Sequence, residues 1–437
     1  MAKGRKLFGT DGVRGEAGTF LTAELATALG RAATASLAAE RPQVLIVRDT
    51  RESGPMLEAA LAAGIAAAGG DALLGGVLPT PAAAILAKRF GLDLAIVVSA
   101  SHNPYRDNGI KFFSAVGTKL DDEAEARIES LIEAEAAPAQ PGRVRELNGG
   151  LEDYLRALEE AFPLDLSGHR VLLDCANGAT FRAGPAIFER LGATVEALAA
   201  EPDGRNINDG CGSTHLDNLA ARVAASEATI GFAFDGDGDR VLAVDGAGRP
   251  HDGDELIALV ARGMSARGEL GGGVAVTVMS NYGFHQAMEE AGIDVAVTKV
   301  GDRYVLDELH SRGWALGGEQ SGHIIDTRFA ATGDGIAAAL MTMRELGGRD
   351  LAEAAPMEKL PQTLVNVEVA EREAVAGATA VWEAVEREEE ALEGRGRVLL
   401  RPSGTEPLVR VMAEAPTAAE ADEVCERLVS VVRQELS

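Results

Sequence analysis

The chain has 437 residues, of which 46% are hydrophobic and 25% are charged, a balance typical of a globular protein. A formal net charge of −27 and an aromatic content of only 4% argue against a nucleic-acid partner. Because the overall charge is acidic, an anionic substrate would have to be attracted by a local basic cleft.

The sequence predicts a cytoplasmic protein without a membrane partner. It contains no run of about 18 apolar residues that would span a membrane, and the basic start, Met1–Lys6, lacks the apolar core of a signal peptide. Cys175, Cys211 and Cys425 are odd in number and far apart, without metal-type spacing, as expected in a reducing compartment.

Three segments of the chain follow the same plan, which indicates three related α/β units. Each begins with an apolar strand that ends in a polar loop, at residues 44–49, 171–174 and 274–278. Each then has a helix-like segment and a second strand, which ends in a denser polar cluster, at 99–104, 235–240 and 318–323. Corresponding loops in related domains are expected to contribute to one shared site.

The C-terminal part follows a different plan. Strands are predicted at 398–400 and 408–413, joined by a loop, and Thr417 with Glu420 forms a capping box at the start of a helix. The Glu-rich stretch 371–393 is expected to be a solvated helix face. The predicted domains are therefore three α/β domains and one small α+β domain, at residues 1–152, 153–252, 253–365 and 366–437.

The first polar cluster, Ser99–Pro104, follows Leu94–Val98, whose unbroken apolar run is typical of a strand buried on both faces. Catalytic groups of open α/β sheets lie in loops at the carboxyl ends of strands. A serine of the hydrolase type would require Gly-x-Ser-x-Gly, which is absent here. His102 has two interpretations, an active-site group or an anchor for the turn.

Two further basic residues stand out in the first unit. Arg14 lies in a Gly-rich loop, Phe8–Gly15, and Lys111 follows the serine cluster in a chain that is poor in lysine. Lysine is more easily tuned as an acid or base than arginine. Both residues could also be ordinary surface charges.

The second cluster, Asp235–Arg240, places three carboxylates at alternate positions, separated by glycines that let the backbone coil around one point. Oxygen ligands without Cys or His suit a hard cation such as Mg²⁺. A calcium EF-hand is excluded, because its sixth and twelfth positions would be Arg240 and Gly246. An acidic surface turn is the alternative, although such close like charges repel one another.

The third and fourth clusters offer groups for a sugar and a phosphate. In Gly318–His323 a carboxylate, an amide, a hydroxyl and an imidazole could bind sugar hydroxyls, and His323 could move a proton. In Arg401–Pro407 an arginine and two hydroxyls could surround a phosphate, and no Walker lysine is present. Each cluster could instead be an ordinary turn.

A serine that carries a phosphoryl group accounts for these clusters together, since its phosphate could share the metal held by the aspartates. Over essentially its whole length the chain resembles the α-D-phosphohexomutase superfamily. The motifs that carry this resemblance occur in the family's order: Phe8–Gly15, Ser99–Pro104, Asp235–Arg240, Gly318–His323 and Arg401–Pro407. The resemblance implies a heart-shaped arrangement of three related α/β domains with mixed sheets and a small α+β domain.

The resemblance also implies roles for individual residues. Ser101 would be phosphorylated and would bind Mg²⁺ together with Asp235, Asp237 and Asp239. The other catalytic positions would be Lys111, His323, Arg14, Arg240 and His102, with the choice between Lys111 and His323 as general base left open. The substrate-binding positions would be Glu319, Ser321, Gly301, Arg303, Arg401, Ser403, Gly404, Thr405 and Arg410.

The implied reaction converts glucosamine 6-phosphate to glucosamine 1-phosphate through a sugar bisphosphate, which is the intermediate or activator, and feeds UDP-N-acetylglucosamine and cell-wall synthesis. Gln320 favours the members of the superfamily that act on glucosamine. A phosphomannomutase/phosphoglucomutase and a non-catalytic phosphosugar sensor are the alternatives. The superfamily is often dimeric, so a homodimer is an expectation that rests on the resemblance alone.

Overall fold

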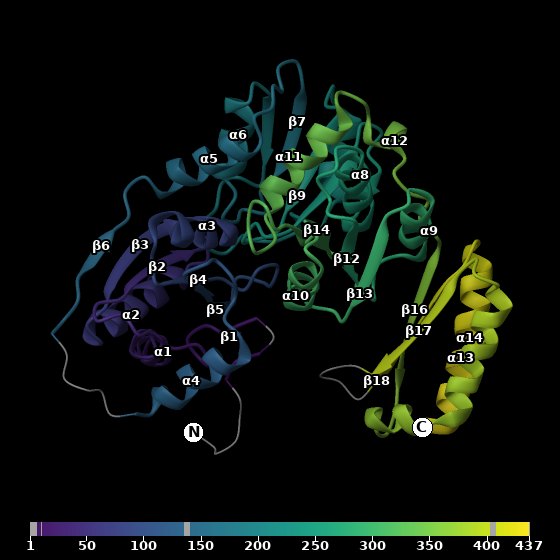
Figure 1. The fold of residues 1–437 in the computed structure, drawn as a ribbon, viewed down its shortest axis with the longest axis horizontal. Helices are drawn as coiled ribbons and strands as arrows, with labels where there is room; N and C mark the ends of the chain where they lie inside the picture. Colours follow the sequence, from purple (N-terminus) through teal and green to yellow (C-terminus); the bar gives the residue numbers. More distant parts are fainter. Residues whose placement is uncertain (1–6, 10, 135–139, 403–407, 437) are drawn as a thin grey trace. The chain divides into compact units, whose positions relative to one another are not determined.

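A computed structural model describes residues 7–9, 11–134, 140–402 and 408–436 (Figure 1). The chain forms two compact units, one made of residues 1–279 and 293–356, the other of residues 280–292 and 357–437. Three sheets with their helices make up the first unit, and a fourth, smaller sheet belongs to the second. No helix within the described residues is long and apolar enough to cross a membrane.

The first sheet has the strand order β1-β5-β4-β2-β3-β6 and combines parallel with antiparallel pairs. Its strands are β1 (Val13–Glu16), β2 (Gln43–Arg48), β3 (Asp71–Val77), β4 (Leu94–Val98), β5 (Asp107–Ser114) and β6 (Val144–Glu146). Its helices are α1 (Ala23–Ala35), α2 (Gly54–Ala67), α3 (Thr80–Phe90) and α4 (Asp122–Ile132). Every residue of β4 is buried, as its unbroken apolar run predicts.

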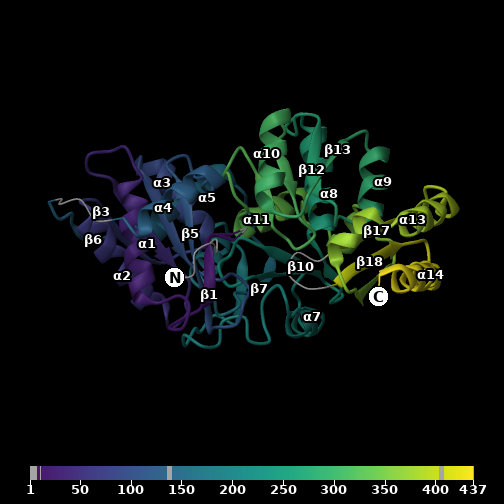
Figure 2. The ribbon, with the colours of Figure 1, turned by 90° about the horizontal axis from the view of Figure 1, so that it is seen from below.

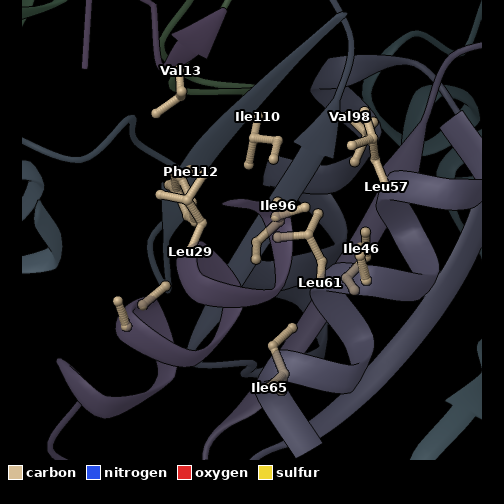
Figure 3. Close-up of a cluster of buried hydrophobic side chains, with 14 of the residues drawn as sticks. Val13, Leu29, Ile46, Leu57, Leu61, Ile65, Ile96, Val98, Ile110 and Phe112 are labelled. Atoms are coloured by element: carbon tan, nitrogen blue, oxygen red, sulfur yellow. The ribbon is translucent and has the colours of Figure 1, made fainter. Parts of the chain in front are cut away.

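One face of this sheet carries a large apolar cluster, which fixes the strands that lead to the serine loop. Ile46, Ile96, Val98 and Phe112 from the strands pack against Leu29, Leu57, Leu61 and Ile65 from α1 and α2 (Figure 3). Each of these side chains is at most 4% exposed. Burial of such a cluster stabilises the sheet by about 25 cal/mol per Å² of apolar surface removed from water.

The second sheet has the order β11-β10-β9-β7-β8. Its elements are β7 (Arg170–Asp174), α6 (Ala183–Arg190), β8 (Thr194–Leu198), α7 (Asp217–Ala224), β9 (Ile230–Phe234), β10 (Val241–Asp245) and β11 (Pro250–His251). Parallel pairs join β7 to β8 and β9, and antiparallel pairs join β10 to β9 and β11, so this sheet is mixed as well.

The third sheet has the order β13-β12-β14-β15, again with parallel and antiparallel pairs. Its strands are β12 (Gly273–Thr277), β13 (Asp294–Thr298), β14 (Leu316–Gly318) and β15 (Ile324–Asp326), and its helices are α8 (Gly253–Ala266), α10 (Asp302–Arg312), α11 (Gly335–Leu346) and α12 (Leu351–Ala354). In Figure 2, α8 and α10 lie on either side of this sheet. Three mixed α/β sheets confirm the predicted fold class for this part of the chain.

The C-terminal unit is built on an antiparallel sheet of order β16-β18-β17. Its elements are α9 (Tyr282–Glu290), β16 (Gln362–Glu368), the 3-10 helix η1 (Arg372–Gly377), α13 (Thr379–Leu392), β17 (Arg397–Pro402), β18 (Leu408–Glu414) and α14 (Ala418–Leu436). It is the small α+β domain that the sequence predicts, with α9 added from a distant part of the chain. The predicted boundary between residues 365 and 366 falls inside β16.

A buried hydrogen bond joins the third sheet's helices to α5 (Gly150–Ala161), which connects the first two sheets. The Tyr154 hydroxyl on α5 donates to the two Asp334 carboxylate oxygens at 3.0 and 2.8 Å. Asp334 also begins α11, where it accepts the Ala337 N–H at 3.0 Å. Burial raises the pKa of Asp334 to about 6, although the hydrogen bonds that it accepts act in the opposite direction.

The variant Asp334→Asn is expected to change how stability depends on pH, because asparagine keeps an acceptor for Tyr154 and Ala337 but does not titrate. The folded-state pKa of Asp334, about 6, lies above its ordinary value of 3.8, so the folded protein binds this proton more tightly than the unfolded chain. The free energy of unfolding of the wild type should therefore fall relative to that of the variant as pH rises from 3.8 to about 6, by on the order of 3 kcal/mol. Chemical denaturation of both proteins across the window measures the difference, and a constant difference would contradict the prediction.

Candidate active site

The polar clusters of the first unit occupy the same place in each of its three sheets. Each cluster follows a strand that pairs in parallel with β2, β7 or β12 of its own sheet. The cluster joins that strand to an antiparallel partner: β4 to β5, β9 to β10, and β14 to β15. The three hairpin loops thus lie at the carboxyl ends of equivalent strands, where α/β proteins place their functional groups. This confirms the architectural repeat inferred from the sequence.

Ser101 lies in the first of these loops and is only 1% exposed. Its Oγ donates to Asp235 Oδ2 at 2.5 Å, across 134 residues of sequence, and lies 3.2 Å from His102 Nδ1. Its φ of 53° is in the left-handed region, which is unfavourable for a residue with a Cβ. The first and second loops therefore meet at the serine hydroxyl.

Asp235, Asp237 and Asp239 are all buried, and one oxygen from each lies within 4.8 Å of the others. Asp235 Oδ1 accepts the N–H groups of Gly238 at 3.0 Å and Arg240 at 3.2 Å, which shapes the turn. Burial, followed by the charges of Asp239 and Asp237, raises the pKa of Asp235 well above its ordinary value. Three carboxylates this close are unfavourable without a cation between or beside them.

The remaining oxygens of this triad indicate where a cation would bind. Asp237 Oδ2 accepts from Lys111 Nζ and Thr80 Oγ1, both at 2.7 Å. Asp237 Oδ1 and Asp239 Oδ1 are buried without a hydrogen-bond partner among the described residues. Because unpartnered buried carboxylate oxygens are costly, and because oxygen donors suit hard divalent cations, the residues present fit a metal such as Mg²⁺.

Lys111 is 1% exposed and lies between carboxylates: 2.7 Å from Asp237, 3.2 Å from Asp11 and 3.9 Å from Asp239. Burial lowers its pKa, but Asp11 and Asp237 more than offset burial, so the pKa of Lys111 is raised. The ammonium group therefore carries its proton at neutral pH and neutralises part of the acidic cluster.

His323, from the third loop, lies 3.6 Å from Asp239 through Nδ1, and its Nε2 accepts the Gly333 N–H at 3.0 Å. Burial lowers the pKa of His323, but the Asp239 carboxylate more than offsets burial, so the pKa is raised above its ordinary value. The Gly333 contact fits the ring with its proton on Nδ1, because a protonated Nε2 could not accept a hydrogen bond. All three loops thus meet around the aspartates.

These side chains border a cavity of about 290 Å³. Its lining contains the predicted positions Arg14, Ser101, Asp239, Arg240, Gly301, Glu319 and His323, together with Asp11, Lys119, Val300 and Asp302. Gly301 N–H donates to Glu319 Oε1 at 3.0 Å, and the exposed Ser321 hydroxyl donates to Glu319 Oε2 at 3.4 Å. The cavity therefore brings the serine, basic groups and residues of the third loop together.

The remaining site residues predicted in the first unit are Arg14, Arg240, Arg303 and His102. Arg240 Nη1 lies 3.4 Å from His102 Nδ1, and Arg14 contacts Asp11. Burial, then the charges of Arg240 and Arg14, lowers the pKa of His102. Arg303 points elsewhere: it donates to Asp122 at 2.5 Å and is not part of the cavity lining. Its substrate-binding role stays a prediction from the resemblance.

Sequence reasoning missed Lys119, which is part of this site. Its Nζ lies 2.6 Å from Asp11 Oδ1 and 2.6 Å from Asp302 Oδ2. Burial lowers its pKa, but the two carboxylates raise it far above the ordinary lysine value. The scarcity of lysine that singled out Lys111 applied equally to Lys119, and was the only available signal.

In the C-terminal unit, Arg401 on β17 and Arg410 on β18 are direct cross-strand partners. Burial, then the charge of Arg410, lowers the pKa of Arg401. Like charges opposite one another destabilise a sheet, and an anion would relieve this repulsion. The predicted positions Ser403, Gly404 and Thr405 lie outside the described residues.

Comparison with known proteins identifies the family. Four models of phosphoglucomutase/phosphomannomutase domains match the chain: alpha/beta/alpha domain I at residues 5–139, domain II at 152–248, domain III at 252–362 and the C-terminal domain at 364–431. A crystal structure of a phosphoglucomutase/phosphomannomutase family protein from Burkholderia thailandensis is similar, with a TM-score of 0.83 and 25% identity over 98% of this chain and 97% of that one.

Two curated proteins, both called phosphoglucosamine mutase, are similar over nearly their whole length. That of Desulforudis audaxviator is 53% identical over 98% of each chain, and that of Pelotomaculum thermopropionicum is 50% identical over 98% of this chain and 99% of its own. These matches confirm the resemblance inferred from the motifs. The chain belongs to the phosphoglucomutase/phosphomannomutase family, within the α-D-phosphohexomutase superfamily.

Proposed function

We propose that the protein is an enzyme that interconverts glucosamine 6-phosphate and glucosamine 1-phosphate by passing a phosphoryl group through Ser101. The observation that carries the proposal is the position of Ser101 Oγ, 2.5 Å from a buried aspartate triad at the edge of a cavity with basic side chains. The names of relatives about half identical to this chain support glucosamine phosphate as the substrate.

Asp235, Asp237 and Asp239 would hold a divalent cation, which we propose is Mg²⁺, with phosphorylated Ser101 as a further ligand. Support comes from two buried oxygens of this triad that accept no hydrogen bond from the described residues. When bound, Mg²⁺ supplies charge neutralisation at the phosphoryl group during transfer.

The proposed reaction begins with phosphoserine at position 101. The bond between Ser101 Oγ and phosphorus breaks as a free hydroxyl oxygen of the sugar phosphate bonds to that phosphorus, which gives a sugar bisphosphate and free Ser101. The sugar bisphosphate then reorients in the site, and the phosphoryl group at its other end is transferred to Ser101 Oγ. One isomeric sugar phosphate leaves, and the phosphoenzyme is regenerated, so no phosphate is gained or lost.

Other side chains would bind, orient and exchange protons. Arg14 and Arg240 line the cavity and would bind phosphoryl oxygens. Glu319, with Ser321 and Gly301 beside it, would bind sugar hydroxyls. Lys111 and His323 are the two candidates for moving the hydroxyl proton, and the cross-strand pair Arg401 and Arg410 would bind the phosphate that is not being transferred.

An assay with three substrates tests this proposal. Purified protein with Mg²⁺ and the matching sugar bisphosphate should act on glucosamine 6-phosphate with a kcat/KM at least roughly tenfold higher than on mannose or glucose 6-phosphate. Higher efficiency on mannose or glucose would favour the alternative that the family's name suggests. Tight binding without turnover of any sugar would favour a phosphosugar sensor. A homodimer and a cytoplasmic location stay predictions.

A further inference from the structure

Arg51, which no motif singles out, lies between β2 and α2 with its side chain fully buried (0% exposed). A guanidinium group has five N–H donors, and here all of them have acceptors. Nε donates to Asp49 Oδ2 at 2.8 Å. The others donate to backbone carbonyls of the serine loop, residues 99–106, namely Ser101 at 2.9 Å, Asn103 at 2.8 Å and Pro104, and to the carbonyl of Asp107, the first residue of β5, at 2.9 Å.

Further hydrogen bonds hold the backbone of Ser101 on both sides. Its carbonyl also accepts from Asn208 Nδ2 at 2.9 Å, and its N–H donates to Ser99 Oγ at 2.9 Å. Ser99 Oγ in turn donates to Asp49 Oδ2 at 2.6 Å, the oxygen that also binds Arg51. Since Ser101 adopts a left-handed φ of 53°, which it would not favour alone, these contacts are what maintain its conformation.

We propose that Arg51 is a positioning residue for phosphoryl transfer, and that it sets the location of Ser101 Oγ by holding the loop's carbonyl groups. The inference rests on the proposed function, because it assigns Arg51 to the same reaction. Arg51 touches no reacting atom, and its acceptors include no residue of the 318–323 loop. Its loss should therefore lower kcat and leave the KM for the sugar phosphate nearly unchanged.

The conservative variant Arg51→Lys separates charge from geometry. Lysine keeps the positive charge beside Asp49 but has three donors on one atom, which cannot reach carbonyl groups that a planar guanidinium spans. We expect kcat to fall roughly 10- to 100-fold with KM within about threefold of wild type, since small misplacements of reacting groups have effects of this size. Intact mass should show slower phosphate loading of Ser101.

Arg48→Lys is the matched control. Arg48 lies three residues earlier and binds Glu58 at 3.1 Å and the Asp49 carbonyl at 3.3 Å, without a hydrogen bond to the serine loop. Its kcat should stay within about twofold of wild type. Equal kcat values for Arg51→Lys and Arg48→Lys would overturn the proposal, and so would a loss that appears only in KM.

Wild-type protein distinguishes failure of this inference from failure of the proposed function. If wild type does not turn over any sugar phosphate, the proposed function is wrong. If wild type is active and Arg51→Lys equals it, only the positioning role is wrong.

A second variant decides the matter if Arg51→Lys does not fold. Asn208→Gly removes the other donor to the Ser101 carbonyl but tolerates the left-handed φ of 58° at that position. We expect a lower kcat at constant KM, by roughly three- to tenfold, because one of the two tethers remains. A kcat within about twofold of wild type would overturn the proposal that carbonyl tethering positions the serine.

Discussion

Alanine in place of Ser101 is expected to lower kcat by at least about 10⁴-fold, because the reaction loses the atom that carries the phosphoryl group. Ser99 is not expected to take its place, because its Oγ donates to Asp49 and accepts the Ser101 N–H. Binding of glucosamine 6-phosphate, measured by calorimetry, should be largely retained, since the proposed sugar-binding groups are untouched.

The intact mass of the same variant tests for phosphorylation of Ser101 independently of turnover. Wild-type protein incubated with sugar bisphosphate should gain a phosphate-sized increment that Ser101→Ala lacks. The control Ser130→Ala removes an exposed hydroxyl on α4 that donates to the Arg127 carbonyl of the same helix, and should keep both the increment and the activity. Near-normal turnover by Ser101→Ala would contradict the phosphoserine mechanism.

Asp235→Asn is expected to abolish cation binding and to lower activity by at least roughly 100-fold. Because burial and the neighbouring carboxylates raise the pKa of Asp235, this group tends toward its neutral form when no cation is bound, and asparagine resembles that form. The amide oxygen can still accept the N–H groups of Gly238 and Arg240. The variant should therefore be folded and close to wild type in stability without metal.

Thermal unfolding with and without Mg²⁺ measures this difference. A ligand that binds only the folded state raises its stability in proportion to the logarithm of ligand concentration over Kd. Mg²⁺ should raise the unfolding temperature of EDTA-treated wild type and leave that of Asp235→Asn unchanged. An equal rise in both proteins would show that the cation binds elsewhere. Since cation binding requires ionised Asp235, the rise in wild type should shrink as pH falls.

The sequence predicted elements best where burial leaves a simple pattern. The strand predicted at Leu94–Val98 has the same bounds as β4, because it is buried along its whole length and ends at a polar cluster. The helix predicted after Thr417 is α14, where the Thr417 hydroxyl accepts the Glu420 N–H at 3.2 Å. The Glu420 carboxylate binds Arg395 at 3.3 Å, a contact that the capping-box pattern does not contain.

Contacts between distant residues could not be predicted in this way. Lys111 lies on β5 of the first sheet, and Asp237 follows β9 of the second sheet, 126 residues away. No local sequence pattern specifies that these two side chains meet. Arg51 and Asn208 look like ordinary loop residues in the sequence, yet both donate to the Ser101 carbonyl. Helix α9 lies between β12 and β13 in sequence but packs with the C-terminal unit, where Tyr282 N–H donates to Glu414 at 2.8 Å.

The partly buried ammonium of Lys119 has a consequence for how the sugar reaches the serine. Asp11 precedes β1 of the first sheet, whereas Asp302 begins α10 beside the third sheet. The Lys119 Nζ lies 2.6 Å from a carboxylate oxygen of each. Drawing these two elements apart would leave a desolvated charge with one counter-ion, at a cost of several kcal/mol. During a catalytic cycle the first and third sheets should therefore travel as one body, and substrate entry and exit should depend on motion elsewhere in the molecule.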